Sequence, residues 1–224
     1  MSKFVWADPP GQRAFPIAKA GYPLVAAGAF VTAVFALLGL TAPALIGMFA
    51  TACVCAFFRD PDRAIPTEPG AVVSPADGKV IVVETVNDCP FLEGPRLKVS
   101  VFMTVFNVHV NRVPVSGTIR SIRYHPGKFL SANLDKASRE NEHNAVVMEA
   151  EDGGEVCYVQ IAGLVARRIV SWVEPGRPMA RGQRCGLICF GSRLDVYLPP
   201  EARAAVAVGR KVRAGTSILG YLPR

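Results

Sequence analysis

The segment Lys79-Val-Ile-Val-Val-Glu-Thr-Val86, which follows the turn sequence Pro75-Ala-Asp-Gly78, shows what kind of fold this chain adopts. β-Branched residues dominate the segment, and proline, aspartate and glycine stand where a strand must begin. A similar composition recurs in four further short segments that are rich in valine: Leu97–Val105, Gly117–Tyr124, Ala145–Ala150 and Glu155–Ile161. Short strands separated by turns predict a mainly β (α+β) sandwich or barrel rather than βαβ units.

The C-terminal region contains a weak internal repeat. Arg181–Gly191 resembles Arg213–Gly220 in rhythm, because each places a glycine turn before a hydrophobic arm. Such repeats are typical of barrel-sandwich folds of the lipoyl or biotinyl type, so we expect a lipoyl-like β domain. No lysine stands at a hairpin tip between apolar residues, which argues against a lipoyl carrier. A fold of this kind does not by itself indicate a function.

The N-terminal region is apolar. Leu24–Leu40 and Ala44–Phe58 carry no charged side chain, and Pro43 between them favours a turn between two short helices. A single crossing of a bilayer needs about 20 residues, so each half is short for one span. We expect a hydrophobic, membrane-associating helical hairpin in residues 1–58 and a β-rich domain in residues 59–224. A buried helical pair is the alternative, and spanning or embedding in one leaflet stays open.

The charges around the apolar region predict where it lies. Arg13 and Lys19 precede it, Arg59 and Arg63 follow it, and the whole chain has a formal net charge of +7. Both ends of a hairpin lie on one side of the membrane, and positive flanks favour the cytoplasmic side. We therefore expect a protein of the cell membrane, on its cytoplasmic face, peripheral or embedded. The basic residues form no block, so no nucleic-acid partner is expected.

Several segments of the β-rich region carry side chains suited to catalysis. In chain order they are Ser74–Val80, Phe102–Gly117, Tyr124–Phe129, Asn141–Asn144 and Phe190–Pro199. The last of them contains Gly191-Ser192 between two strand-like runs. Taken alone, a Gly-Ser pair indicates an ordinary turn or bulge. The other four segments give it a different context.

In this order and spacing, the segments resemble the phosphatidylserine decarboxylase family, in its short bacterial and archaeal, pyruvoyl-dependent form. The resemblance extends from about Arg59 to the C-terminus. It implies a precursor that cuts itself at Gly191-Ser192 into a β chain, residues 1–191, and an α chain, residues 192–224. The two chains are expected to stay together as a heterodimer, and further homo-oligomerisation is left open. The implied enzyme is a carboxy-lyase that converts phosphatidylserine, a phospholipid substrate, into phosphatidylethanolamine and CO₂.

The same resemblance implies a cofactor made from the chain itself. The Oγ atom of Ser192 attacks the carbonyl of Gly191, where no side chain obstructs the approach. Elimination and hydrolysis then leave a pyruvoyl group at the new N-terminus, which forms a Schiff base with the substrate amine and draws electrons as CO₂ leaves. No added organic cofactor is expected. No metal is expected either, because the three histidines show no zinc-ligand spacing.

Two residues are candidates for activating the serine, which needs a base and a group that orients the base. His109 lies in the segment that bears histidine across the family, and an imidazole titrates near neutral pH. Asp77, in the Pro-Ala-Asp-Gly turn, is expected to hold that imidazole. With Ser192 they form the expected catalytic set. The plainer interpretation makes Asp77 a turn residue and His109 a strand-face histidine.

Two positions depart from the family's pattern. Longer members resemble D-Y-H-x-x-H-x-P, where this chain has Arg112 in place of the second histidine, and the family usually has arginine where this chain has His143. Arg112 is expected to bind the phosphate or carboxylate of the substrate. The expected substrate-binding residues are Arg112, Tyr124, His125, Lys128 and His143.

Two other functions fit the same residues. A lipid decarboxylase acting on an archaetidylserine-type ether lipid would use an identical set. A non-enzymatic, membrane-tethered barrel-sandwich binding module would leave Gly191-Ser192 as a turn, and its chain would stay uncut.

Overall fold

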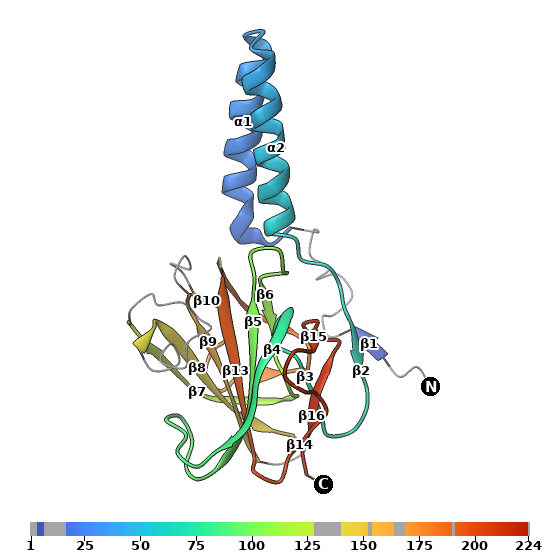
Figure 1. Cartoon of the computed structure of the whole chain (residues 1–224), viewed down its shortest axis with the longest axis vertical. Coiled ribbons are helices and arrows are strands. Elements are labelled where there is room, and N and C mark those ends of the chain that lie inside the picture. Colours follow the sequence, from blue (N-terminus) through green and yellow to red (C-terminus); the bar gives the residue numbers. More distant parts are fainter. Residues whose placement is uncertain are drawn as a thin grey trace. The chain divides into compact units, whose positions relative to one another are not determined.

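The structure, a computed structural model, describes residues 4–6, 17–127, 140–151, 154–163, 169–189 and 191–223 of the 224-residue chain. The chain divides into two compact units, Gly11–Asp62 and a second one formed by Met1–Pro10 with Arg63–Arg224. The first is helical and the second is built from strands (Figure 1). The prediction of a mainly β protein with apolar helices near its N-terminus is thereby confirmed.

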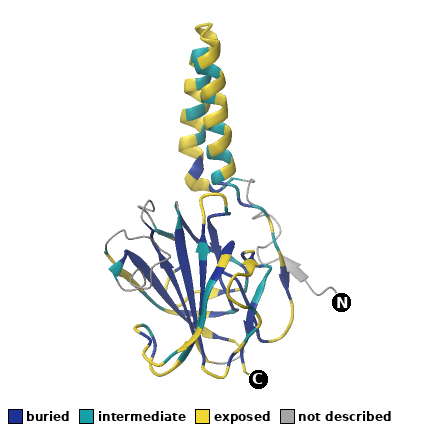
Figure 2. Cartoon of the chain, viewed as in Figure 1, coloured by how far each residue is buried: buried dark blue, intermediate teal, exposed yellow. Residues whose placement is uncertain are grey.

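The helical unit is a hairpin of two apolar helices, α1 (Tyr22–Leu37) and α2 (Thr41–Phe57), preceded by the short 3-10 helix η1 (Lys19–Gly21). No residue of α1 or α2 is buried, although nearly all are apolar (Figure 2). By length and composition Lys19–Leu37 is able to cross a bilayer, whereas Thr41–Phe57 is shorter.

The turn of the hairpin lies just before the expected position. Gly39 has a φ of 73° there, in the left-handed region that favours glycine. Pro43 does not separate the helices but lies in the first turn of α2. Proline is tolerated in that turn because the first N–H groups of a helix have no partner within it.

The second unit is built on an antiparallel sheet with the strand order β11-β7-β8-β9-β13-β5-β4-β15. The five strands expected from the sequence, β4, β5, β7, β8 and β9, are present with ends shifted by at most two residues. The bounds are β4 (Gly78–Val86), β5 (Arg96–Met103), β7 (Gly117–His125), β8 (His143–Ala150), β9 (Glu155–Ile161), β11 (Pro178–Met179), β13 (Ser192–Leu198) and β15 (Lys211–Val212).

Within the described residues, three smaller sheets accompany this large one, in the orders β10-β12-β6, β14-β16-β3 and β1-β2. Their strands are β1 (Phe4–Trp6), β2 (Ala64–Pro66), β3 (Ala71–Val73), β6 (Val110–Arg112), β10 (Ile169–Ser171), β12 (Arg184–Ile188), β14 (Arg203–Ala204) and β16 (Ile218–Tyr221). Strand β6 follows β5 in the chain but pairs with β12, so the β5–β6 connection leaves the large sheet for a smaller one.

Both faces of the large sheet are buried around β13, all of whose residues are buried (Figure 2). Successive side chains of a strand point to opposite faces. Leu194, Val196 and Leu198 belong to the larger hydrophobic cluster, and we call their side the main-core face. Tyr197 belongs to a smaller cluster, and we call its side the second face. By the same alternation the Ser192 side chain lies on the main-core face, inside the protein.

Candidate active site

Ser192 is the first residue of β13 and lies opposite Met103, the last residue of β5. Its hydroxyl donates a hydrogen bond to Met103 Sδ over 3.4 Å, and both side chains are fully buried. The preceding Gly191 has a φ of 55°, and a Cβ built on it would have no neighbour within 4 Å. Backbone conformation, rather than space, is therefore what favours glycine at position 191.

The two residues expected to activate the serine lie in different surroundings. His109, just before β6, is fully buried, and its backbone carbonyl accepts a hydrogen bond from the N–H of Ile188. The Asp77 carboxylate accepts hydrogen bonds from Arg63 over 2.9 Å and from the N–H of Ala214 over 2.7 Å. Among the described residues no hydrogen bond joins Asp77 to His109. The activating roles of both residues stay predictions, and the sequence did not reveal Arg63 as a partner of Asp77.

Arg112, expected to bind substrate, is enclosed by the protein. It is 2% exposed, and its guanidinium donates to the carbonyl of Gly182 over 2.8 Å. Its side chain passes so close to Gly215 that a Cβ there would lie 2.8 Å from Arg112 Cδ. The contact with Gly182 ties β6 to the turn before β12, and a contact with substrate stays a prediction.

His125 and His143 come together as a pair. They lie opposite each other on β7 and β8, with their rings stacked at 4.9 Å, and Phe91 meets His143 edge-on. Nδ1 of His143 lies 2.8 Å from the carbonyl oxygen of Asn141, so this nitrogen carries the hydrogen. Burial, with a smaller effect of His125, lowers the pKa of His143, against the hydrogen bond to Asn141. His143 lies on the second face, opposite to the Ser192 hydroxyl.

The two remaining residues that were expected to bind substrate are Tyr124 and Lys128. Tyr124 is exposed, and its hydroxyl donates to Glu142 over 3.1 Å. Partial desolvation, followed by the Glu142 carboxylate, raises the pKa of Tyr124. Lys128 lies outside the described residues. The described part of the chain contains no group of three His, Cys, Asp or Glu side chains that could hold a metal ion.

A buried row of amides, which the sequence interpretation missed, ends beside Ser192. Asn144 donates to Gln160 over 3.1 Å, and Gln160 donates to Asn111 over 2.9 Å. Asn111 donates in turn to Met103 Sδ at 3.8 Å, the atom that also accepts from Ser192. One signal was available: Gln160 interrupts an otherwise apolar run, Val156–Ile161, at a position facing the main core.

An ion pair on the second face anchors the strand immediately after Ser192. The guanidinium of Arg193 binds both carboxylate oxygens of Asp195, over 2.6 and 3.0 Å, and also donates to the Ser100 hydroxyl. All three residues are fully buried. Removing one partner of such a pair typically costs about 3–5 kcal/mol because the other charge is left buried without compensation. The ion pair therefore fixes the backbone at Arg193, and with it the position of the adjacent Ser192.

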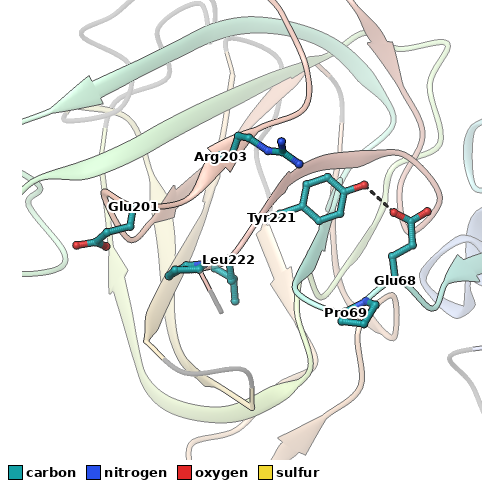
Figure 3. Close-up of a pocket in the computed structure, with 7 residues that line it drawn as sticks. Glu68, Pro69, Glu201, Arg203, Tyr221 and Leu222 are labelled. Atoms are coloured by element: carbon teal, nitrogen blue, oxygen red, sulfur yellow. Dashed lines mark hydrogen bonds between the residues drawn. The ribbon is translucent and has the colours of Figure 1, made fainter.

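The β unit also has a surface pocket with a volume of about 470 Å³. Figure 3 shows the residues that line it. In it the Tyr221 hydroxyl donates to Glu68 over 2.6 Å, and Arg203 lies over the Tyr221 ring. The pocket is lined by Glu68, Pro69, Glu201, Arg203, Tyr221, Leu222 and Pro223. Glu201 follows the end of β13, whereas Ser192 begins it, and a strand of that length spans roughly 20 Å. The pocket is therefore separate from the surroundings of Ser192.

Comparison with known proteins identifies the family. A family model described as phosphatidylserine decarboxylase matches residues 50–220. A phosphatidylserine decarboxylase proenzyme from Desulfotalea psychrophila is 47% identical over 207 residues, which cover 92% of this chain and 97% of that protein. One from Burkholderia pseudomallei is 51% identical over 207 residues, 92% of this chain and 95% of its own length. One from Ralstonia nicotianae is 55% identical over 172 residues, 77% and 80% of the two chains. The matched region contains Gly191-Ser192, and this chain belongs to the phosphatidylserine decarboxylase family.

Proposed function

We propose that this chain is the precursor of a phosphatidylserine decarboxylase, which cuts itself between Gly191 and Ser192 and then converts phosphatidylserine into phosphatidylethanolamine and CO₂. One observation carries the proposal. The Gly191-Ser192 pair stands at the buried start of a central strand, within the region shared with relatives named phosphatidylserine decarboxylase proenzyme. A proenzyme is a protein that must be processed before it acts, and this pair is where serine chemistry can cut the chain.

The self-cleavage needs only the chain and one water molecule. Ser192 Oγ bonds to the carbonyl carbon of Gly191 and the peptide C–N bond breaks, which leaves an ester and a free amine. Loss of the Ser192 Cα proton with cleavage of its Cβ–O bond gives a Gly191 carboxylate and a dehydroalanine. Water then replaces the nitrogen, which leaves as ammonia, and a ketone remains at residue 192. His109 is our candidate for the group that accepts the hydroxyl proton, and Asp77 for the group that supports it.

The surroundings of residue 192 suit a small uncharged carbonyl group. Met103 and Asn111, its neighbours on the main-core face, carry no charge and are buried. A pyruvoyl group at this place supplies an electron-withdrawing carbonyl as CO₂ leaves the substrate. We assign the orientation of the substrate to Arg112, Tyr124, His125, Lys128 and His143.

The β chain, residues 1–191, and the α chain, residues 192–224, are proposed to remain together after the cut. Strand β13 pairs with β5 along its whole length and with β9 over Arg193–Tyr197. Its hydrogen bonds on both sides are made by residues of the other chain, so the cut removes one peptide bond and leaves the ladders in place.

The helical unit is proposed to hold the enzyme at the cytoplasmic face of the cell membrane, where its lipid substrate lies. Phe30 and Phe49 are 70% and 72% exposed, and Leu37 is 87% exposed. A hairpin so apolar on its outside is suited to acyl chains rather than water. The domain limits at residues 1–58 and 59–224 are part of this proposal.

An intact mass spectrum of the purified protein under denaturing conditions tests the function, together with conversion of phosphatidylserine in vesicles. We expect a short chain matching residues 192–224, with its serine replaced by pyruvoyl, and release of CO₂. Ser192→Ala should give one inactive chain of 24.0 kDa. A wild-type protein that stays uncut and inactive would contradict the proposal, and activity restricted to an ether lipid would change the substrate.

A further inference from the structure

We propose that the amide row Asn144–Gln160–Asn111 is a positioning device for self-cleavage. It holds the Met103 thioether against the Ser192 hydroxyl and so sets the side-chain conformation from which Ser192 attacks. The inference rests on the proposed cut at Gly191-Ser192. The three amide residues act through Met103 and are positioning residues rather than catalytic ones.

The row has a direction, and Met103 defines it. A thioether sulfur only accepts hydrogen bonds, so Asn111 must turn its Nδ2 toward Met103. The Oδ1 atom of Asn111 then faces Gln160, which must present its Nε2, and Gln160 Oε1 is left for the Nδ2 of Asn144. Each observed contact obeys this order. Reversing any one amide would set two acceptors against each other at one of the junctions.

The row lies entirely inside the protein and joins separate sheets. Asn111, Gln160 and Asn144 are 0%, 1% and 3% exposed. Gln160 and Asn144 belong to the large sheet, whereas Asn111 belongs to β6 in the small sheet β10-β12-β6. Room for the row is provided by Gly186, where a Cβ would lie 2.8 Å from Gln160 Nε2. A side chain at that position would displace the amide.

The location of the row favours function over simple packing. Its neighbours on the main-core face of β13 are apolar, and leucine or methionine could fill the same volume without any need for partners. Here, instead, the three amides are hydrogen-bonded in sequence, from Asn144 to Met103 Sδ. The same sulfur atom accepts a hydrogen bond from the Ser192 hydroxyl. Because the attacking oxygen must approach the carbonyl before it in the chain, the orientation of that hydroxyl decides the rate.

The test reverses the row without changing its shape. In Asn144→Asp the carboxylate only accepts, so Gln160 turns its Nε2 toward it, Asn111 turns its Nδ2 toward Gln160, and Asn111 Oδ1 is left against Met103 Sδ. We expect self-cleavage at least tenfold slower than wild type at pH 8–9. Burial at this position raises the pKa of the introduced carboxyl group, so it takes up a proton and regains a donor as the pH falls. The rate of self-cleavage should therefore recover toward pH 6. Asn144→Ala leaves the direction set by Met103 and should cleave faster than Asn144→Asp at pH 8–9, despite its cavity.

The rates are measured as the fraction of chain split at 191/192 after cell-free synthesis of the full-length protein and a shift to each pH. Val147→Thr is the matched control, because it places a hydroxyl in the core from β8, the strand of Asn144, but on the second face. Every variant retains the neighbouring ionisable groups, so any effect of pH through them is common to all curves. These groups are His109, His143 on the opposite face and Tyr124 opposite Asn144. Thermal unfolding of each variant with Ser192→Ala separates stability from rate.

Two results would overturn the inference. One is an Asn144→Asp protein that follows the wild-type rate at every pH up to 9. The other is a loss that is independent of pH and equalled by Asn144→Ala. Failure of the wild-type chain to split would instead count against the proposed function, and so the two failures are distinguishable.

Discussion

The bond proposed to break joins two residues with opposite structural demands. Gly191 lies in the left-handed region of backbone conformation, with a φ of 55°, while Ser192 lies in an extended, fully buried strand. A side chain at 191 would cost about 1–2 kcal/mol through its conformation alone. The serine is meanwhile held by Met103 on one face, and its neighbour Arg193 by Asp195 on the other. At the residue scale, the reacting peptide is therefore fixed from both sides before any chemistry begins.

His109→Ala and Asp77→Asn test the activation of the serine at this scale. If the two residues move the hydroxyl proton, we expect self-cleavage to slow by roughly 10²-fold or more. The measurement is the ratio of uncut chain to residues 192–224 on a denaturing gel during synthesis. Glu201→Gln, in the distant pocket, is the matched control and should process normally. Complete processing in both test variants would leave them at most a part in decarboxylation.

His143 predicts a dependence of stability on pH. Its pKa is lowered in the folded protein, so between its folded value and the unfolded value of about 6.5 the unfolded chain binds more protons. Stability therefore rises with pH across this window and is lost as the pH falls below about 6.5. We expect the melting temperature of uncut Ser192→Ala protein to fall on acidification, and to fall less when His143→Gln is added. Parallel curves for the two proteins would show that His143 does not titrate in this way.

At the scale of single elements, α1 and α2 meet through matched small residues. A Cβ on Gly28 would lie 2.7 Å from the Thr51 hydroxyl, and one on Gly47 equally close to that of Thr32. Each threonine hydroxyl also donates to the carbonyl of the glycine four residues before it in its own helix, over 2.8 Å. Small residues that let helix backbones approach closely are typical of packing within membranes.

This packing predicts an engineered disulfide. The Cβ built on Gly28 lies 3.5 Å from Thr51 Cβ, at the short end of the range that disulfides need. With Cys53 and Cys55 replaced by alanine, we expect Gly28→Cys with Thr51→Cys to cross-link on mild oxidation in membranes, as detected by loss of thiol labelling. Gly28→Cys with Phe49→Cys is the control, because Phe49 points outward and is 72% exposed. Equal cross-linking of both pairs would contradict the observed packing.

On the scale of the whole molecule, the β unit is formed by two segments of the chain, one before and one after the helical unit. Strand β1 pairs with β2 so that Trp6 lies opposite Ala64, although the helical unit separates them in sequence. The two segments are therefore neighbours within one sheet. A short connection can join them in the manner of a β-hairpin.

We accordingly expect the β unit to fold and cut itself when Gly11–Asp62 is replaced by a short Gly/Ser linker. The product should turn over a soluble short-chain phosphatidylserine at a rate close to that of the full-length enzyme. On vesicles of long-chain phosphatidylserine its KM should rise at least tenfold, because the apolar hairpin no longer holds it at the surface. Vesicle co-sedimentation and CO₂ release measure the two effects. Unchanged vesicle activity would assign membrane attachment to the β unit.

Local sequence was sufficient for much of the fold. Strands β4 and β9 were predictable because runs rich in β-branched residues begin at Asp-Gly or Gly-Gly turns, and the helical hairpin was predictable because no charge interrupts it. The position of the turn in this hairpin was harder to predict, because a proline such as Pro43 can either interrupt a helix or lie in its first turn. The family and the pair Gly191-Ser192 also followed from motifs that are contiguous in the chain.

What only the tertiary structure decided are the contacts between distant segments. Hydrogen bonds from Arg63 to Asp77, and from Gln160 to Asn111, join residues that no local pattern connects. The opposite faces taken by His143 and the Ser192 hydroxyl likewise depend on strand register, which sets which side chains share a face. Short-range propensity thus determined the elements and the reactive pair. The side chains that surround this pair are set by the pairing of β13 with β5 and β9 and by the contact of β6 with the large sheet, which local sequence does not encode.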